Sequence, residues 1–335
     1  MPRRFVQELA DGEAVEEVFL VSDKQLRANR NGNLYIQVDL RDRTGVINGR
    51  LWNAAEPLFR SFDVGDYVRT RGKVQLFQGA LQIILSGLEK TEPDAVELTD
   101  FLPHTTRDIG GLLQTLRDGL RKIGNPHLRA LAECFLMDDS FVRDFCQVPA
   151  GVRNHHAYVG GLLEHVVNLM DAAERLLPLY PGVDRDLILA GVFLHDCGKV
   201  RELSCKRAFA YTDEGQLIGH ITIGIEMVND KVAEAVKLTG EPFPPELLLR
   251  VKHMILSHHG QLDFGSPVVP MTPEAIALAA LDNLDAKVHT VTPDIRDDRG
   301  AGAWTPFSAS MQRRLFKGLA AADDTPAGVP PEGVD

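Results

Sequence analysis

The sequence predicts a multidomain protein in which an N-terminal five-stranded β-barrel is followed by a mostly all-α domain. Its 335 residues exceed the about 250–300 that one hydrophobic core usually serves. Apolar and polar residues alternate through much of residues 1–90, as they do in strands with one buried face. From residue 101 to residue 322 the apolar positions recur at helical spacing instead. We therefore expect one domain at 1–90 and another at 101–322.

The alternation predicts five strands, with a short helix at 54–62 between the third and the fourth. The strands are expected at 15–26, 33–40, 46–52, 67–77 and 80–88. The buried face of the second is predicted to hold Leu34, Ile36, Val38 and Leu40. That of the fourth is predicted to hold Val68, Thr70, Gly72, Val74 and Leu76, with Tyr67 pointing outward. This order of elements resembles an OB-fold barrel.

Tyr35, Arg50 and Trp52 lie on the outward faces of the second and third predicted strands. Single-stranded nucleic acid is bound by aromatic rings that stack on bases and by cations that contact phosphates. The second and third strands of an OB fold commonly supply that surface, so these three residues are predicted to bind substrate. The alternative is a structural role, in which the barrel buries the aromatic rings and the arginine is exposed to solvent.

Residues 91–100, TEPDAVELTD, contain four acids, a proline and no base, which is typical of a linker. In the second domain, apolar stripes at helical spacing are expected at 160–177, 186–194, 245–257 and 273–288. Residues 323–335 contain acids and three prolines but no base, and they are expected to form a disordered acidic tail.

The composition excludes several classes of protein. Four cysteines without paired spacing argue against a disulfide framework and against a thiolate zinc site. Neither a membrane-spanning run nor a signal peptide is found, so a cytoplasmic location is expected. The net charge is −11, yet residues 1–90 hold 13 basic and 12 acidic side chains. The acidic total therefore does not exclude nucleic acid, which responds to the local field.

Five of the eleven histidines form an ordered series with two carboxylates. The series consists of His165, His195, Asp196, His220, His258, His259 and Asp282. Most of these groups lie on or at the end of an apolar predicted helix, where an unpaired polar group is costly. A shared metal satisfies them together, and imidazole with carboxylate suits Mn²⁺, Fe²⁺, Co²⁺, Zn²⁺ or Mg²⁺. The other histidines, such as His289, are expected to be structural.

The order H…HD…D, in GGLLEHVVNL, GVFLHDCGKV and LAALDNLDAKV, resembles the signature of HD-domain metal-dependent phosphohydrolases. The histidines of IGHI and SHHG are similar to those of HD proteins that hold a second metal. With HHAYVGGLLEH, YTDEGQLIGHI and the N-terminal barrel, they resemble the YhaM-type 3′→5′ exoribonucleases of bacteria. This resemblance covers roughly residues 14–300.

The resemblance implies two divalent ions, with Mn²⁺ the foremost candidate. The ligands of the first ion are expected to be His165, His195, Asp196 and Asp282. Asp196 is also expected to bridge to a second ion, whose other ligands are His220 and His258. Asp285, three residues after Asp282, is the rival for the last carboxylate.

Three groups are expected to be catalytic, namely Asp196, Lys199 and His259. Asp196 is predicted to be catalytic because it bridges two ions that clamp phosphate oxygens and activate a water. Lys199 is placed to neutralise a phosphate oxygen. The alternative interpretation is a solvent-exposed lysine at the end of a helix. His259 either joins the second ion or meets the substrate. Arg153, His155 and His156, ahead of Gly160 and Gly161, are predicted to contact phosphate or the leaving group.

The leading hypothesis is a metal-dependent 3′→5′ exoribonuclease acting on single-stranded RNA, with single-stranded DNA as a further candidate substrate. The alternative is an HD-domain hydrolase of small nucleotides or cyclic dinucleotides with a regulatory barrel. A third interpretation, a binding module with a vestigial pocket, requires the loss of ligands, and the series here is complete. No membrane partner is expected, and a homo-oligomer is left open.

Overall fold

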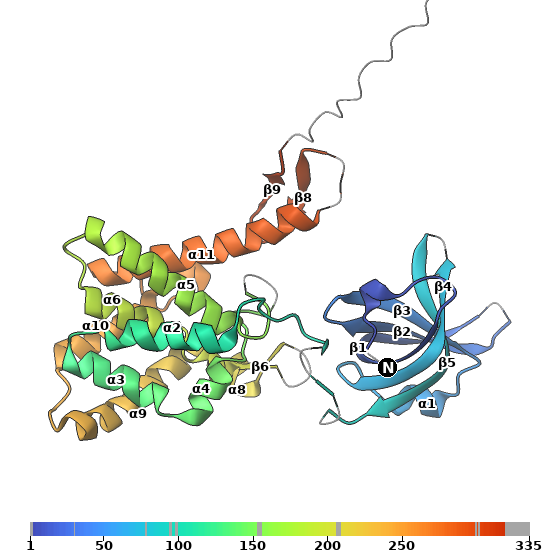
Figure 1. Ribbon diagram of the computed structural model, residues 1–335, viewed down its shortest axis with the longest axis horizontal. Helices are drawn as coiled ribbons and strands as arrows, with labels where there is room; N and C mark the ends of the chain where they lie inside the picture. The colour runs from blue at the N-terminus through green and yellow to red at the C-terminus, as the bar shows by residue number, and fades with distance from the viewer. Residues whose placement is uncertain are drawn as a thin grey trace, which may run out of the picture.

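The computed structural model describes residues 3–29, 31–77, 79–93, 96–97, 100–152, 156–205, 209–298, 300 and 302–318. A β-barrel and a helical bundle lie side by side along the longest axis of the molecule (Figure 1). The predicted tail at 323–335 and parts of the predicted linker at 91–100 lie outside the described residues.

The barrel contains all five predicted strands and the short helix α1 (Glu56–Arg60). The strands are β1 (Ala14–Ala28), β2 (Leu34–Asp42), β3 (Gly45–Trp52), β4 (Tyr67–Phe77) and β5 (Ala80–Thr91). They close in the order β1-β2-β3-β5-β4, and only the β3–β5 pair is parallel among these neighbours. Alternate residues such as Ile36, Val38 and Val68 fill the interior, as the alternation predicts.

The burial of three strand residues differs from the expectation. Leu34 and Leu76 were assigned to the core, but they are 39% and 55% exposed. Leu34 pairs with Ala28, and Leu76 pairs with Leu81, close to hairpin tips where the closed barrel provides no opposite strand to cover them. Tyr67 points outward yet is buried, because the ring of Phe101 packs on it with centroids 4.7 Å apart.

The second domain is a bundle of helices around one apolar core. The longer helices are α2 (Ile109–Arg121), α3 (Pro126–Leu136), α5 (Gly161–Leu176), α6 (Arg185–Leu194), α9 (His220–Thr239), α10 (Pro245–Ser257) and α11 (Pro273–Asp297). The short ones are α4 (Asp139–Phe145), α7 (Lys199–Glu202) and α8 (Asp213–Leu217). Two small pairs of strands accompany them, namely β6 (Leu203–Ser204) with β7 (Ala210–Tyr211) and β8 (Trp304–Ser308) with β9 (Arg313–Phe316).

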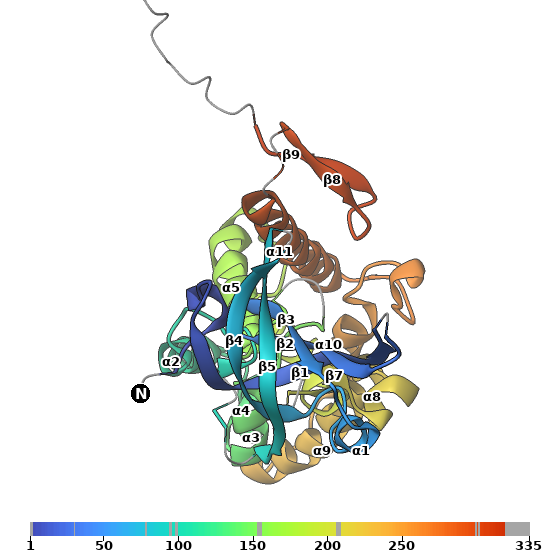
Figure 2. The ribbon, with the colours of Figure 1, turned by 90° about the vertical axis from the view of Figure 1, so that its right-hand side faces the viewer.

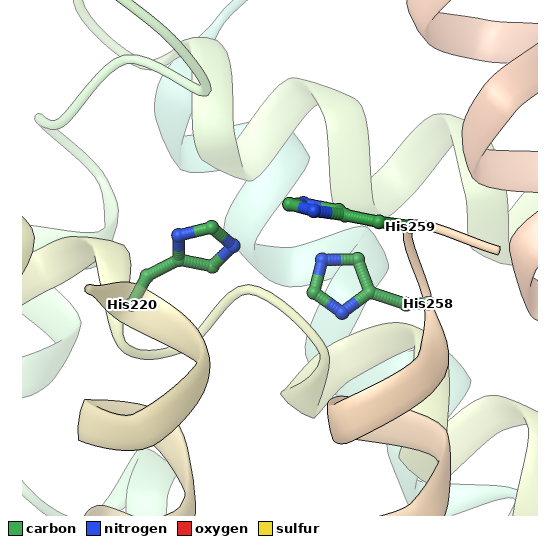
Figure 3. Close-up of side chains that lie close together, drawn as sticks. All are labelled: His220, His258 and His259. Carbon is green, nitrogen blue, oxygen red and sulfur yellow. The ribbon is translucent and has the colours of Figure 1, made fainter. Parts of the chain in front are cut away.

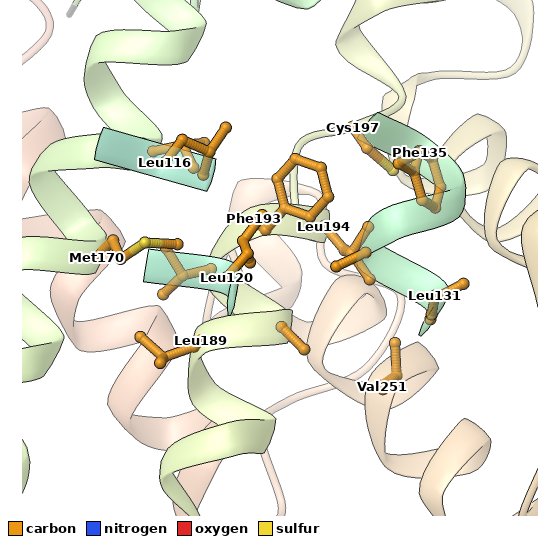
Figure 4. Packing of buried hydrophobic residues seen from close by; sticks show 14 of the residues in the cluster. Leu116, Leu120, Leu131, Phe135, Met170, Leu189, Phe193, Leu194, Cys197 and Val251 are labelled. Atoms are coloured by element: carbon orange, nitrogen blue, oxygen red, sulfur yellow. The ribbon is translucent and has the colours of Figure 1, made fainter. Parts of the chain in front are cut away.

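Helix α6 lies in the middle of this bundle, and every one of its residues from Leu187 to Leu194 is buried. Phe193 contacts the rings of Phe135 and Phe141 edge-on, and Figure 4 shows it packed among leucines of neighbouring helices. Because α6 is apolar on all sides, its C-terminal end is fixed deep inside the domain. The dipeptide His195-Asp196 follows directly at that end.

Candidate metal centre

The predicted series of histidines and carboxylates converges in the middle of the helical domain. His165 lies on α5, His195 and Asp196 follow α6, and His220 begins α9. His258 and His259 follow α10, and Asp282 lies on α11. Four of them, His165, His195, Asp196 and His258, are almost fully buried. Helices far apart in sequence therefore direct these side chains to one place.

One group of ligand atoms lies between α5, α6 and α11. The Nε2 atom of His165 is 3.2 Å from Oδ1 of Asp282 and 3.3 Å from Nε2 of His195. The Oδ2 atom of Asp196 is 3.3 Å from Nε2 of His195. Three imidazole or carboxylate groups at these separations can hold a divalent cation.

A second group lies beside the first, where α9 begins and α10 ends. The rings of His220, His258 and His259 face one another there (Figure 3). Oδ1 of Asp196 is 3.4 Å from Nε2 of His220 and 3.5 Å from Nε2 of His258. Asp196 thus directs one carboxylate oxygen to each group.

The imidazoles are held by their Nδ1 atoms, which leaves Nε2 toward the centre. Nδ1 of His195 donates to the carbonyl of Val192 at 2.8 Å, and Nδ1 of His258 donates to the carbonyl of Ile255 at 2.7 Å. His259 donates in the same way to the carbonyl of Phe264 at 2.7 Å. Since a carbonyl only accepts, Nδ1 carries the proton and Nε2 of a neutral ring offers its lone pair.

Three buried atoms at the centre lack a hydrogen-bond partner among the described residues. They are Oδ1 of Asp196, Nε2 of His220 and Nε2 of His258. An unsatisfied buried polar atom is costly, and both of these nitrogens lie within 3.5 Å of Asp196 Oδ1, so the three atoms indicate a common partner. A divalent cation fits this set because it accepts lone pairs from imidazole and carboxylate alike.

The electrostatics of the centre favour a negative Asp196 and neutral imidazoles at His258 and His259. Burial opposes ionisation of Asp196, but Lys199 and His195 hold the pKa of its carboxyl well below its usual range. Burial lowers the pKa of both His258 and His259. Burial also opposes protonation of His165, yet Asp282 and Asp285 outweigh it and raise its pKa to about 9. A cation and a proton therefore compete for His165.

Lys199 is buried on the first turn after Asp196. Its Nζ lies 2.7 Å from Oδ2 of Asp196 and donates to the carbonyl of Ala150 at 2.6 Å. The alternative of a solvated lysine is therefore wrong for this side chain. Lys199 neutralises the buried carboxylate and fixes its orientation.

Asp285 and Asp282 take different positions around His165. Oδ2 of Asp285 lies 2.7 Å from Nδ1 of His165, on the opposite side of the ring from Asp282. The same oxygen lies 2.8 Å from Nε2 of His156, whose Nδ1 is 2.6 Å from the hydroxyl of Tyr158. Asp285 thus orients two histidine rings.

Two residues next to the centre, His289 and Glu202, were not predicted from the sequence. The ring of His289, expected to be structural, lies 4.0 Å from that of His156, and its Nδ1 is 3.2 Å from Asp285 Oδ1. Its spacing of four residues from Asp285 was a signal that both share one helix face. Oε1 of Glu202 accepts from Nδ1 of His220 at 2.9 Å, and no motif pointed to Glu202.

Two glycines allow the backbone to bring these groups together. A Cβ on Gly198, in the segment HDCGK, would lie 2.0 Å from the carbonyl oxygen of His220. A Cβ on Gly161 would lie 2.0 Å from the carbonyl oxygen of His156. Any larger residue at either position would push α9 or the segment before α5 away from the centre.

A cavity of about 480 Å³ adjoins the second group of histidines. His259 is one of its lining residues, and the others include Gln261, Phe264, Asn283 and Lys287. Phe264 is 59% exposed, and its backbone carbonyl is bonded to His259. The cavity therefore offers an aromatic ring and a cation next to the centre.

The predicted nucleic-acid residues lie together on the barrel surface. Tyr35 pairs with Trp52 across β2 and β3, and their ring centroids are 4.8 Å apart. Arg50 lies over the ring of Phe77 at 5.7 Å, and Trp52 is 42% exposed. Of the predicted residues near the centre, His156 lies within it, whereas Arg153 and His155 lie outside the described residues.

Comparison with known proteins assigns both domains. Residues 162–287 match the HD domain, and residues 20–91 match the OB-fold nucleic acid binding domain. The 3′-5′ exoribonuclease YhaM of Bacillus velezensis is 35% identical over 306 residues, covering 91% of this chain and 95% of that protein. The YhaM of Bacillus subtilis is 34% identical, with the same coverage of both chains. The chain belongs to the YhaM family.

The fold of this YhaM family member agrees with the sequence prediction. The OB-fold match begins within β1 and ends at β5, and the HD match runs from α5 into α11. The second match therefore includes every residue of the predicted series of histidines and carboxylates. Within the described ranges, no helix combines the length and apolar character that a bilayer crossing requires.

Proposed function

We propose that this protein is a metal-dependent 3′→5′ exoribonuclease that hydrolyses phosphodiester bonds of single-stranded RNA. The observation that carries the proposal is the position of Asp196, with Oδ2 toward His165 and His195 and Oδ1 toward His220 and His258. Membership of the YhaM family supports the same activity. No comparison favours the alternative, a hydrolase of small nucleotides.

The proposed cofactor is a pair of divalent ions, with Mn²⁺ first and Fe²⁺, Co²⁺, Zn²⁺ or Mg²⁺ as substitutes. The first ion would be held by His165, His195, Asp196 and Asp282. The second would be held by Asp196, His220 and His258, with His259 next to it. Bound there, such ions supply charge for phosphate oxygens and an activated water.

The protein's own residues prepare this centre. The carbonyls of Val192 and Ile255 fix the tautomers of His195 and His258, so that no ring must reorient. Lys199 keeps Asp196 ionised and positioned, and its remaining donor is proposed to meet a phosphate oxygen. His156 is proposed to contact the substrate through the network around Asp285.

The 3′-terminal nucleotide is proposed to occupy the cavity beside His259. Phe264 supplies a stacking surface for its base, and Lys287 supplies a cation for phosphate. We propose that the barrel, residues 1–90, binds the RNA strand through Tyr35, Arg50 and Trp52. Residues 101–322 are proposed to carry out catalysis, and residues 91–100 to link the two domains. Arg153 and His155 keep their proposed substrate contacts.

The decisive experiment incubates the purified protein with Mn²⁺ and 5′-labelled single-stranded RNA. A ladder that shortens from the 3′ end is expected, and EDTA should abolish it. Matched DNA, cyclic dinucleotides and mononucleotides are assayed in parallel. Intact RNA together with a cleaved small nucleotide would overturn the proposal. Metal analysis should give two ions per chain, and light scattering on the same sample measures the number of chains per particle.

A further inference from the structure

The hairpin that follows α11 has an exposed face of aromatic and arginine side chains. Strands β8 and β9 pair Trp304 with Phe316 and Phe307 with Arg314. The irregularity between Trp304 and Phe307 brings both residues to the same face, although they are three positions apart. Trp304, Phe307 and Phe316 are 49%, 66% and 53% exposed, and Arg314 is exposed as well.

The opposite face anchors the hairpin. Thr305 and Leu315 are buried, and the Leu315 amide donates to Oγ1 of Thr305 at 3.0 Å. Nζ of Lys317 lies 2.7 Å from Oδ2 of Asp298, just beyond the end of α11. The hairpin stands at the end of α11 in both views (Figures 1 and 2). Its aromatic face is therefore held in place and turned outward.

The charge of this segment is opposite to that of the whole chain. Residues 302–318 contain Arg313, Arg314 and Lys317 and no acid, whereas the chain carries a net −11. Arg313 and Arg314 donate to the carbonyls of Met311 and Thr305. Among the described residues, no carboxylate pairs with either guanidinium. Both cations are thus available to a polyanion.

The hairpin repeats the chemistry of the barrel surface. The Trp304–Phe316 ring centroids are 5.0 Å apart, and the Tyr35–Trp52 centroids are 4.8 Å apart. Both are cross-strand pairs on an exposed sheet face, with an arginine on a nearby position of the same sheet. Exposed rings with unpaired arginines suit bases and phosphates better than an apolar partner, which would leave the guanidinium groups uncompensated.

We propose that the β8–β9 hairpin is a second binding site for single-stranded RNA, separate from the barrel. The inference rests on the proposed function, because it assumes that the 3′ end of the strand enters the metal centre. Asp282 and Asp297 are 15 residues apart on α11, which at about 1.5 Å per residue separates the centre from the hairpin base by about 22 Å. The hairpin therefore binds nucleotides on the 5′ side of the scissile bond.

The first test replaces the rings by Trp304→Ala with Phe307→Ala and measures the affinity for a long unstructured RNA in EDTA. We expect binding to weaken by about tenfold or more, since each base stack contributes that order of affinity. Turnover of a dinucleotide in Mn²⁺ should stay unchanged, because a dinucleotide does not reach the hairpin. Tyr180→Ala removes a ring that is 57% exposed elsewhere on the domain and is the matched control.

The second test concerns charge. Arg313→Gln with Arg314→Gln should reduce the slope of log affinity against log salt by about 0.7 for each phosphate that the protein no longer neutralises. Arg175→Gln, which removes an exposed arginine paired with Asp171, should leave the slope unchanged. RNA carrying 4-thiouridine upstream of its 3′ end should crosslink to residues 302–318 in the unaltered protein.

The outcomes separate the two proposals. If the unaltered protein shortens RNA while the hairpin variants bind like their controls and crosslinks form only on the barrel, the hairpin proposal is wrong. A hairpin variant that changes the number of chains per particle without changing RNA affinity would identify a self-association surface and overturn it as well. If RNA stays intact in Mn²⁺ but still crosslinks to the hairpin, the proposed function fails and the binding site stands.

Discussion

The imidazole of His165 is held between two carboxylates. Its Nδ1 lies 2.7 Å from Oδ2 of Asp285, and its Nε2 lies 3.2 Å from Oδ1 of Asp282. Nε2 also faces His195, so Asp282 lies on the side of the ring where the candidate ion would bind. Asp285 lies on the other side, where it can only orient the ring. The geometry thus distinguishes two carboxylates that are three residues apart on one helix.

Substitution of these two residues should therefore have unequal effects. Asp285→Ala removes an orienting partner, which typically costs about 10–100-fold in metal affinity or activity. Asp282→Ala removes a ligand and should cost more. Rates are measured over a titration of Mn²⁺, where excess Mn²⁺ should restore much of the activity of Asp285→Ala and little of that of Asp282→Ala. The reverse order would make Asp285 the ligand.

Asp196→Ala should abolish turnover while the fold stays intact. This carboxylate directs one oxygen to each set of histidines, so its loss removes a ligand from each proposed ion. Asp144→Ala, at an acid whose side chain is 44% exposed and which pairs with Arg143, is the control. Activity is assayed on labelled RNA, and circular dichroism checks the fold. A rate above about a tenth of the unaltered protein's would contradict the bridging role.

Glu202→Gln should selectively weaken the binding of the second proposed ion. Oε1 of Glu202 accepts from both the backbone N–H and Nδ1 of His220, and this bond fixes which nitrogen of the ring faces Asp196. We expect the Mn²⁺ concentration for half-maximal activity to rise about tenfold or more. Glu226→Gln, at an exposed acid on α9, should leave it unchanged. Metal analysis should find the loss confined to one ion per chain.

Trp52→Ala should weaken the binding of long RNA more than it slows cleavage of a short diester. Removing the exposed ring takes away a stack worth about 1–3 kcal/mol per base, whereas the metal centre lies in the other domain. Affinity is measured by fluorescence anisotropy and cleavage by initial rates, with Tyr180→Ala as the control. Equal losses on both substrates would count against a gripping role for the barrel.

Glu274→Gln should destabilise the fold by about 1–3 kcal/mol at pH 7. This buried acid lies in the first turn of α11, accepts from the Asp184 amide at 2.9 Å and pairs with Arg250 at 2.8 Å. Burial opposes its ionisation, but the Asp184 amide and Arg250 outweigh burial and lower its pKa below 4.5.

The pH dependence of that effect follows from the lowered pKa. A group with a depressed folded pKa stabilises the protein above its unfolded pKa and loses this contribution as the pH falls through the folded pKa. The difference in unfolding free energy between Glu274→Gln and the unaltered protein should therefore be constant near neutral pH and shrink below pH 4.5. Urea unfolding at several pH values measures it, and a difference that grows on acidification would refute the assignment.

The sequence alone determined the architecture and most members of the central cluster. Period-two alternation identified five strands because a barrel buries every second residue. The apolar stripe expected at 160–177 is α5, and its Leu162, Val166 and Met170 lie in the core. His165, His195, Asp196 and Asp282 were found because polar groups on apolar helices need a common partner. The exposure of Leu34 and Leu76 and the burial of Tyr67 were not predicted, because alternation does not show where a strand leaves the barrel or what packs outside it.

Only the tertiary structure decided the roles within the cluster. The choice between Asp282 and Asp285 depends on which side of the His165 ring each one reaches, and helical spacing leaves that open. His289 and Glu202 entered the site because α11 and α7 bring them against His156 and His220. Local sequence specifies which groups a helix carries, whereas the angles at which helices cross specify which atoms meet.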